Sequence, residues 1–181
     1  MKNELDIKGL HHAAYRCKDA AETVKFYTEV LGLEYGIAAS EDRVPSTGEH
    51  SPYMHVFFRM NDNSYVAFFE LPEAPEMGRD GNTPEWVQHL ALRVDDMATQ
   101  ERYRQRLIDR GLEVIGPIDH KICQSIYFFD PNGHRLELTV DTTTAEMASR
   151  LAEVADDMLE EWSRTKRAPR HASWMHEDLF K

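Results

Sequence analysis

Two histidines and two glutamates occupy matching places in the two halves of the sequence. His12 and His89 each begin the pattern His-x-Ala-x-Arg-x-x-Asp, and Glu70 and Glu137 each lie in the last strand-like segment of a half, inside an apolar run. Burying a carboxylate without a partner is costly, whereas two imidazole nitrogens and two carboxylates together suit zinc, nickel, iron(II), cobalt or manganese. The sequence therefore predicts one divalent metal ion bound by these four residues.

Arg16 and Arg93 each follow one of these histidines by four residues. Because side chains along a strand alternate between its two faces, Arg16 shares a face with His12, and Arg93 shares a face with His89. The small alanine between each pair leaves room for a ligand. We therefore expect both arginines to hold the anionic group of a small substrate.

The same repeat predicts the elements that must position these residues. After each Asp of the pattern comes a segment with helical periodicity, which ends at Gly32 in the first half and at Gly111 in the second. Two strand-like segments then follow in each half, around turns at residues 61–63 and 130–133. Each half is therefore expected to form a strand, a helix and then two or three strands.

The organisation of the whole chain follows from these repeats. We expect a first module, a connection containing proline and glycine, a second module, and a C-terminal helix with an extended arm, over residues 7–71, 72–84, 85–141 and 142–181. The helix, expected over about residues 145–163, carries an apolar stripe from Met147 to Trp162. The stripe must pack on another surface, and the arm with Trp174, Leu179 and Phe180 would wrap a partner subunit or lie over the site as a lid. We expect a homodimer.

Charge and composition restrict the partners of this chain of 181 residues. Its formal charge of −11, from 32 acidic against 21 basic residues, would repel a phosphate backbone, so nucleic acid is excluded as a partner. The sequence contains no apolar run long enough to span a membrane. Cys17 and Cys123 are too few for a disulfide framework, which favours reduced thiols in a cytoplasmic protein.

Together these motifs resemble the vicinal oxygen chelate superfamily, which includes glyoxalase I, fosfomycin-resistance proteins, methylmalonyl-CoA epimerase and extradiol dioxygenases. The resemblance covers about residues 7–141 and rests on residues 12–19, 26–27, 31–32, 89–96, Tyr127 and 130–137. It implies an α+β fold, in which two tandem βαβββ modules form a cupped mixed sheet around a metal site. His12, Glu70, His89 and Glu137 match the ligand positions on the first and last strands of the modules. The substrate implied is a small molecule that chelates the metal through adjacent oxygens.

The glyoxalase-like or epimerase-like class is the favoured reading of the reaction, as a metal-dependent lyase or isomerase. In this class a ligating glutamate, Glu137 or Glu70, is the base that moves a proton between adjacent carbons. Arg16 matches the glyoxalase arginine that holds a carboxylate of the substrate. The asparagine that follows the first glutamate in glyoxalases is absent, because residues 71–74 read Leu-Pro-Glu-Ala. This difference argues against specificity for glutathione.

Two alternatives stay open. An extradiol-type Fe(II) dioxygenase would cleave a catechol ring with Tyr127 as a hydrogen-bonding catalytic residue and His120 beside it as a substrate-binding residue. Against this, Ser64 stands where the acid-base histidine of those enzymes is expected, and Glu70 would fill the position that oxygen needs. The third interpretation is a metal-free protein that binds a small molecule such as a drug.

Overall fold

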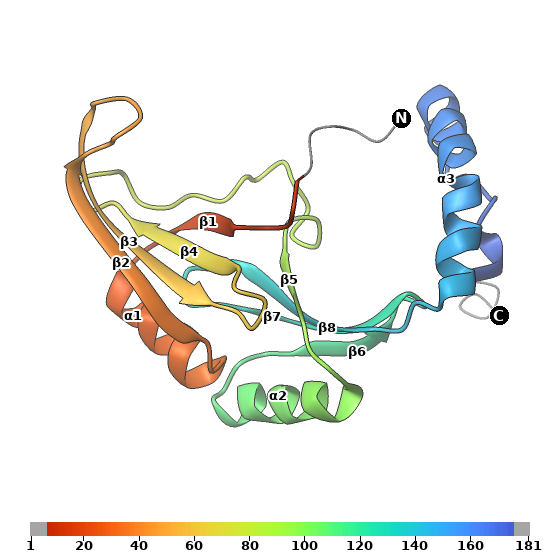
Figure 1. Ribbon diagram of the computed structural model, residues 1–181, viewed down its shortest axis with the longest axis horizontal. Helices are drawn as coiled ribbons and strands as arrows, with labels where there is room; N and C mark the ends of the chain where they lie inside the picture. Colours follow the sequence, from red (N-terminus) through yellow and green to blue (C-terminus); the bar gives the residue numbers. More distant parts are fainter. Residues whose placement is uncertain (1–6, 176–181) are drawn as a thin grey trace. The chain divides into compact units, whose positions relative to one another are not determined.

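The computed structural model describes residues 7–175 and contains two four-stranded mixed sheets and three α-helices (Figure 1). The chain divides into two compact units. Within the described residues, unit 1 comprises residues 7–90, 109–112 and 129–136, and unit 2 comprises residues 91–108, 113–128 and 137–175. The α+β class expected from the sequence is confirmed, and each βαβββ module forms one sheet.

The first sheet has the strand order β1-β4-β3-β2. Strand β1 runs parallel to β4, whereas β3 is antiparallel to both β4 and β2. The elements of this module are β1 (His12–Cys17), α1 (Ala20–Lys25), a π-helical turn (Phe26–Val30), β2 (Glu34–Arg43), β3 (His50–Arg59) and β4 (Tyr65–Glu70). Helix α1 begins where the Asp19 carboxylate accepts a hydrogen bond from the Glu22 amide at 2.7 Å.

One face of the first sheet is covered by the helical segment and is here called its helix face. The ring of Tyr27 packs against Phe58 and Phe68, with ring centroids 4.9 Å and 4.8 Å apart, and all three side chains are fully buried. The opposite face, here called the open face, carries His12, Ala14 and Arg16 on β1. Burial of the aromatic cluster on the helix face holds the strands in register, and this register fixes which side chains reach the open face.

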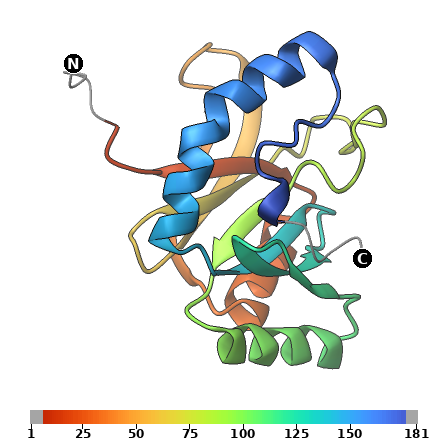
Figure 2. The same cartoon turned by 90° about the vertical axis from the view of Figure 1, so that its right-hand side faces the viewer.

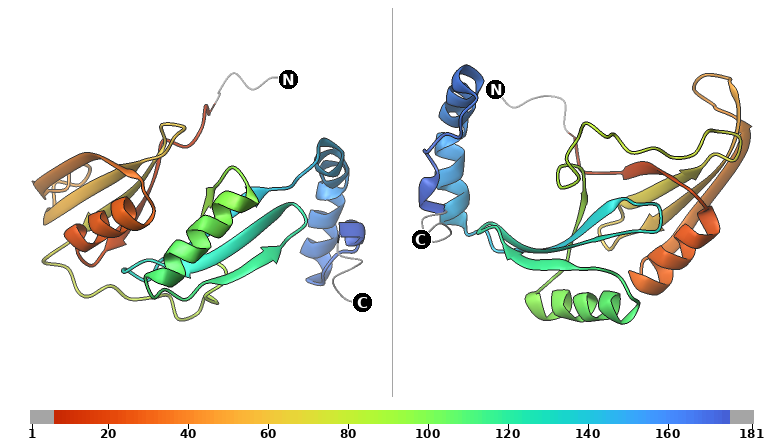
Figure 3. Two further views of the ribbon diagram at one scale, coloured as in Figure 1. Left: turned by 90° about the horizontal axis from the view of Figure 1, so that it is seen from below. Right: turned by 180° about the vertical axis from the view of Figure 1, so that it is seen from behind.

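The second sheet has the strand order β5-β8-β7-β6. Its module consists of β5 (Leu90–Arg93), α2 (Met97–Asp109), β6 (Ile115–Asp119), β7 (Cys123–Phe129) and β8 (Arg135–Asp141). Helix α2 lies along one face of this sheet (Figure 3), where Leu107 is fully buried. The side-chain amide of the buried Gln100 donates to the backbone carbonyls of Gln124 and Leu138 at 2.8 Å and 2.9 Å. These hydrogen bonds join α2 to the central strands β7 and β8.

The turns expected from the sequence are present in both modules. Gly32 and Gly111 end the two helical segments with φ of 75° and 78°, and the turns between the last two strands contain Asn63 and Gly133 with φ of 64° and 89°. These left-handed conformations are the ones that glycine and asparagine adopt most readily. Both expected hairpins are therefore confirmed.

The C-terminal helix α3 (Ala145–Thr165) begins at Thr144, whose hydroxyl accepts a hydrogen bond from the Met147 amide. None of its residues is buried. The arm was expected to be extended, and over its described part this is wrong, because the chain turns back along α3 (Figure 2). His171 contacts Glu161 at 2.8 Å, and Arg150 stacks on Trp174 at 3.9 Å. Leu179 and Phe180 lie outside the described residues.

None of the helices within residues 7–175 combines the length and the apolar character needed to cross a membrane.

Candidate functional site

The open face of the first sheet brings an exposed histidine next to a buried one. The His12 ring is exposed and lies 5.7 Å from the Phe57 ring and 6.4 Å from the His55 ring. Burial, and then the charge of His12, lower the pKa of His55 to about 4, so the His55 ring is neutral at pH 7. His12 also has Nδ1 at 2.8 Å from Nδ1 of His11.

Arg16 lies on the same open face as His12 and is half-buried. Its guanidinium donates to the carbonyl of Pro75, and its Nε atom is buried without a hydrogen-bond partner among the described residues. An arginine keeps its charge at all physiological pH values. The residue can therefore still bind an anion, as its position four residues after His12 predicts.

Glu70 lies on the helix face of the first sheet, opposite to His12, which corrects the expectation that the two residues face one site. The parallel register pairs His12 with Tyr65 and Cys17 with Glu70. Glu70 lies five positions after Tyr65, so it is displaced by roughly 16 Å along the strands from the level of His12. The Glu70 carboxylate accepts a hydrogen bond of 2.7 Å from the Ala20 amide at the start of α1. Its position is explained by the helix that it caps.

The second sheet presents its own polar cluster around Glu137. Glu137 is 5% exposed and accepts a hydrogen bond from the Ser125 hydroxyl, and the Tyr127 hydroxyl lies 2.8 Å from His120 Nε2. Burial, and then the negative charge of Glu137, raise the pKa of Tyr127, so this phenol stays protonated at neutral pH. Unlike Glu70, Glu137 shares its face of the sheet with the other polar residues of its module.

The remaining two predicted residues are exposed. Arg93, at the end of β5, is one of the groups that lower the pKa of Asp141, after the hydrogen bonds that this carboxylate accepts from Thr143. His89 immediately precedes β5. Within residues 7–175, no three His, Cys, Asp or Glu side chains lie close enough together to hold a metal ion. The ligand set expected from the sequence therefore stays a prediction.

Comparison with known families identifies the chain. The model of the Glyoxalase/Bleomycin resistance protein/Dioxygenase superfamily matches residues 9–138, which is most of the sequence. The chain belongs to this superfamily. The resemblance noted from the motifs is thereby confirmed, and the βαβββ modules are those of this superfamily.

Relatives within the superfamily differ in the activities that their names state. The chain is 25% identical over 141 residues to the putative ring-cleaving dioxygenase MhqA of Bacillus subtilis (strain 168), a match that covers 76% of this chain but 42% of that protein. It is 27% identical over 146 residues to the fosfomycin resistance protein FosX of Mesorhizobium japonicum, covering 80% of this chain and 94% of the relative. The chain thus spans less than half of MhqA and nearly all of FosX.

A solved structure of FosX from Listeria monocytogenes shares the fold, with a TM-score of 0.54 at 22% identity. The match covers 80% of this chain and 99% of that chain. The structure is that of a mutant form of FosX, complexed with Mn(II) and 1S,2S-dihydroxypropylphosphonic acid. At this identity the likeness to this structure supports the fold alone.

The superfamily implies a divalent metal, and the donor chemistry of three of the four expected ligands, taken residue by residue, suits such an ion. His12 and His89 are exposed imidazoles, and Glu137 is a carboxylate that accepts a hydrogen bond from the Ser125 hydroxyl. Two nitrogens and one carboxylate are a common donor set for manganese, iron(II) and zinc. Glu70 does not fit, because the start of α1 uses its carboxylate.

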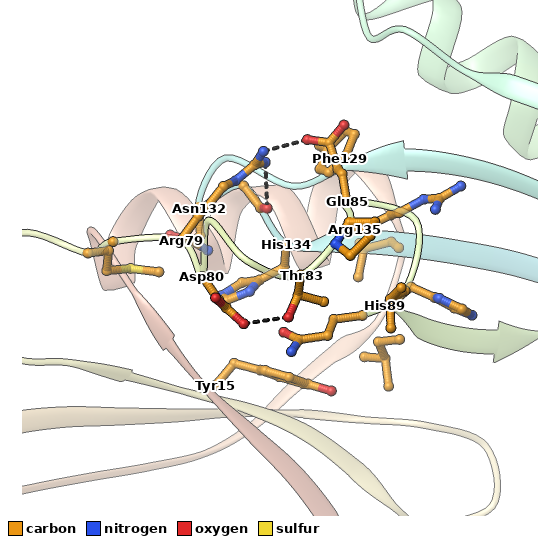
Figure 4. Close-up of a pocket in the computed structure, with 18 of the residues that line it drawn as sticks. Tyr15, Arg79, Asp80, Thr83, Glu85, His89, Phe129, Asn132, His134 and Arg135 are labelled. Carbon is orange, nitrogen blue, oxygen red and sulfur yellow. Dashed lines mark hydrogen bonds and ion pairs between the residues drawn. The ribbon is translucent and has the colours of Figure 1, made fainter. Parts of the chain in front are cut away.

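Unit 1 also contains a cavity of about 710 Å³, lined by residues 77–90 and 129–136 and by aromatic residues of the first module (Figure 4). Of the expected site residues, only His89 lines it. Arg79 pairs with Glu85 and donates to the Gly133 carbonyl at 3.0 Å.

His55 is the residue that the sequence-based site missed. The sequence spacing could have indicated this residue. His55 and Phe57 are two residues apart in an apolar segment, so their side chains point to the same face of a strand. Only the pairing of β3 with β4, and of β4 with β1, shows that this face is the one that carries His12.

Proposed function

We propose that this protein is a divalent-metal-dependent enzyme, which binds a small anionic substrate through two adjacent oxygens and transforms it without net oxidation. The observation that carries the proposal is the buried Glu137 carboxylate, which lies beside a protonated tyrosine in a chain of this superfamily. A carboxylate that is 5% exposed is costly unless a cation or several donors stabilise it.

The proposed metal ligands are His12, His89 and Glu137. When bound, the metal would act as a Lewis acid that stabilises negative charge on the substrate oxygens. Manganese, zinc, nickel, iron(II) and cobalt all suit these nitrogen and carboxylate donors. Glu70 is left out of the set because it caps α1.

The chain's own residues would bind the substrate and move its protons. Arg16 and Arg93 would hold an anionic group, and the Tyr127 hydroxyl would donate a hydrogen bond to a substrate oxygen. His120 would orient Tyr127, because its Nε2 lies 2.8 Å from that hydroxyl. Glu137, whose charge acts on Tyr127, would be the base that accepts a proton from the substrate.

The experiment is a set of anaerobic turnover assays on protein loaded separately with manganese, nickel or zinc. The substrates are fosfomycin, for hydration, and the hemithioacetal of methylglyoxal and glutathione, for proton transfer. We expect turnover of an anionic substrate of one of these two kinds without oxygen, and with zinc as well as manganese. Turnover that requires oxygen and a redox-active metal would contradict the proposal.

Ring cleavage is the second candidate, and one observation favours it. With Glu70 excluded, two histidines and one carboxylate remain, a set that leaves positions for a catechol and for oxygen. The name of MhqA states such an activity for that protein. Oxygen uptake by the Fe(II)-loaded protein with 4-methylcatechol, together with a yellow product, would establish this candidate over the first.

We also propose that the protein is a homodimer. Helix α3 supports this, because Leu159 and Trp162 on its apolar stripe are 65% and 46% exposed. Exposed apolar residues in a continuous stripe are typical of an interface between subunits.

A further inference from the structure

Two buried polar atoms lack a hydrogen-bond partner among residues 7–175, and both belong to the open face of the first sheet. They are Nε of Arg16 and Nε2 of His55. The strand register pairs Phe69 of β4 with Arg16 of β1 on one side and with His55 of β3 on the other. The two unpaired atoms therefore belong to one row of side chains that crosses three adjacent strands.

The surroundings of His55 are those of an apolar residue. Its ring is stacked 3.5 Å from the Phe69 centroid and lies 4.0 Å from the Phe57 centroid, and the residue is 9% exposed. A phenylalanine would fill this aromatic wedge without leaving a polar atom unpaired. Folding therefore does not explain why an imidazole occupies this position.

A role in binding would account for it, because the His55 ring borders the proposed site. The His55 ring lies 6.4 Å from the ring of His12, and Arg16 holds the other end of the row. Strands β1 and β3 are two strand spacings apart, about 10 Å, so a small molecule can reach both residues across Phe69.

We propose that His55 is a substrate-binding residue, which hydrogen-bonds a hydroxyl or ether oxygen of a small organic anion whose charged group is held by Arg16. The inference rests on the proposed function and adds the substrate class, an anion with a neutral oxygen separated from the charge by a short carbon chain. Phe69, between the two residues, contacts that carbon chain.

The test compares two anions that differ in two hydroxyls, propylphosphonate and 1,2-dihydroxypropylphosphonate. Calorimetry on metal-free protein isolates the contribution of the side chains from that of the metal. We expect wild-type protein to bind the diol about five- to tenfold more tightly than propylphosphonate, which is the gain in affinity that one or two hydrogen bonds provide. His55→Phe should remove this preference and leave propylphosphonate binding unchanged, whereas Arg16→Gln should weaken both anions equally.

The matched control is His50→Phe, because His50 is the first residue of the same strand and its side chain is exposed. This variant should bind both anions as wild type does. Equal binding of the two anions by wild-type protein, absence of binding of both, or an unchanged preference in His55→Phe would overturn the proposal.

Thermal unfolding of the metal-free proteins provides a second measurement that does not depend on a ligand. Since His55→Phe removes an unpaired polar atom and keeps the aromatic wedge, we expect its Tm to equal or exceed that of wild type. A Tm several degrees lower would show that His55 serves the fold, and would overturn the proposal. His55→Gln keeps a polar group and should retain part of the preference for the diol.

The same samples separate this inference from the proposed function. If wild-type protein prefers the diol but binds no Mn(II), the metal-dependent function is wrong and the role of His55 stands. If the wild-type protein binds Mn(II) but shows no preference between the anions, the role of His55 is wrong and the metal-dependent function stands.

Discussion

His12 and Glu70 point to opposite faces of the same four-stranded sheet. His12 shares the open face with the Phe57 and His55 rings, while Glu70 accepts a hydrogen bond from the Ala20 amide on the helix face. The two residues look equivalent to His89 and Glu137 in the sequence. Glu137, however, shares a face with Ser125 and lies among polar groups, so the two glutamates have different surroundings.

Replacing Glu70 should therefore reduce stability and leave metal binding intact. Glu70→Ala removes the acceptor for the Ala20 amide, and we expect the free energy of unfolding to fall by about 1–2 kcal/mol. Urea denaturation measures this change, and elemental analysis measures the metal content. A loss of metal in a folded Glu70→Ala protein would restore Glu70 to the ligand set.

Removing a proposed ligand should have the opposite effect. Because each of His12→Ala, His89→Ala and Glu137→Gln deletes one of three donors, we expect metal content to fall at least tenfold at limiting metal. His50→Ala is the control, since this exposed histidine lies on β3 away from the proposed set. Wild-type stoichiometry in His12→Ala or Glu137→Gln would contradict the assignment.

The thiol of Cys17 should be inert in the folded protein. Burial, countered in part by Thr23 and reinforced by the charge of Glu70, raises the pKa of Cys17 to about 11, and the residue is 1% exposed. A thiol reagent at pH 8 should modify Cys123 alone in native protein and both cysteines in denaturant. Rapid modification of two thiols under native conditions would contradict this prediction.

The same shift predicts how stability depends on pH. Between an ordinary thiol pKa and about 11 the folded state keeps the Cys17 proton that the unfolded state loses, so stability falls as pH rises through this range. The loss should be about 2–3 kcal/mol. The measurement compares the free energy of unfolding of wild type and Cys17→Ala as a function of pH, because the variant lacks this contribution. Parallel profiles between pH 8 and 11 would refute it.

Charges on the exposed stripe of α3 should disrupt the proposed dimer. Leu159→Glu and Trp162→Glu introduce carboxylates at apolar positions that are 65% and 46% exposed, so the isolated chain should tolerate them. Light scattering should give half the mass of the wild-type particle, with unchanged secondary structure by circular dichroism. Ser163→Glu, just beside this stripe, serves as the control. A monomeric wild-type protein would refute the dimer directly.

Much of this protein could be predicted from its sequence by local rules. The repeat with His12 and His89, the glycines that end the helical segments and the two hairpins each depend on residues close together in the chain. Turn conformations and the alternation of side chains along one strand are local properties, so they can be recognised without a structure. The same rules placed Arg16 on the face of His12.

Tertiary structure decided which strands share that face. Alternation assigns Glu70 to one side of β4 and His55 to one side of β3, but it does not say which side carries His12. That depends on the register of β1 against β4 and of β4 against β3, which is set by packing of Tyr27 against Phe58 and Phe68 on the helix face. Since a shift of one residue exchanges the two faces of a strand, residues distant in sequence meet or separate only through this packing.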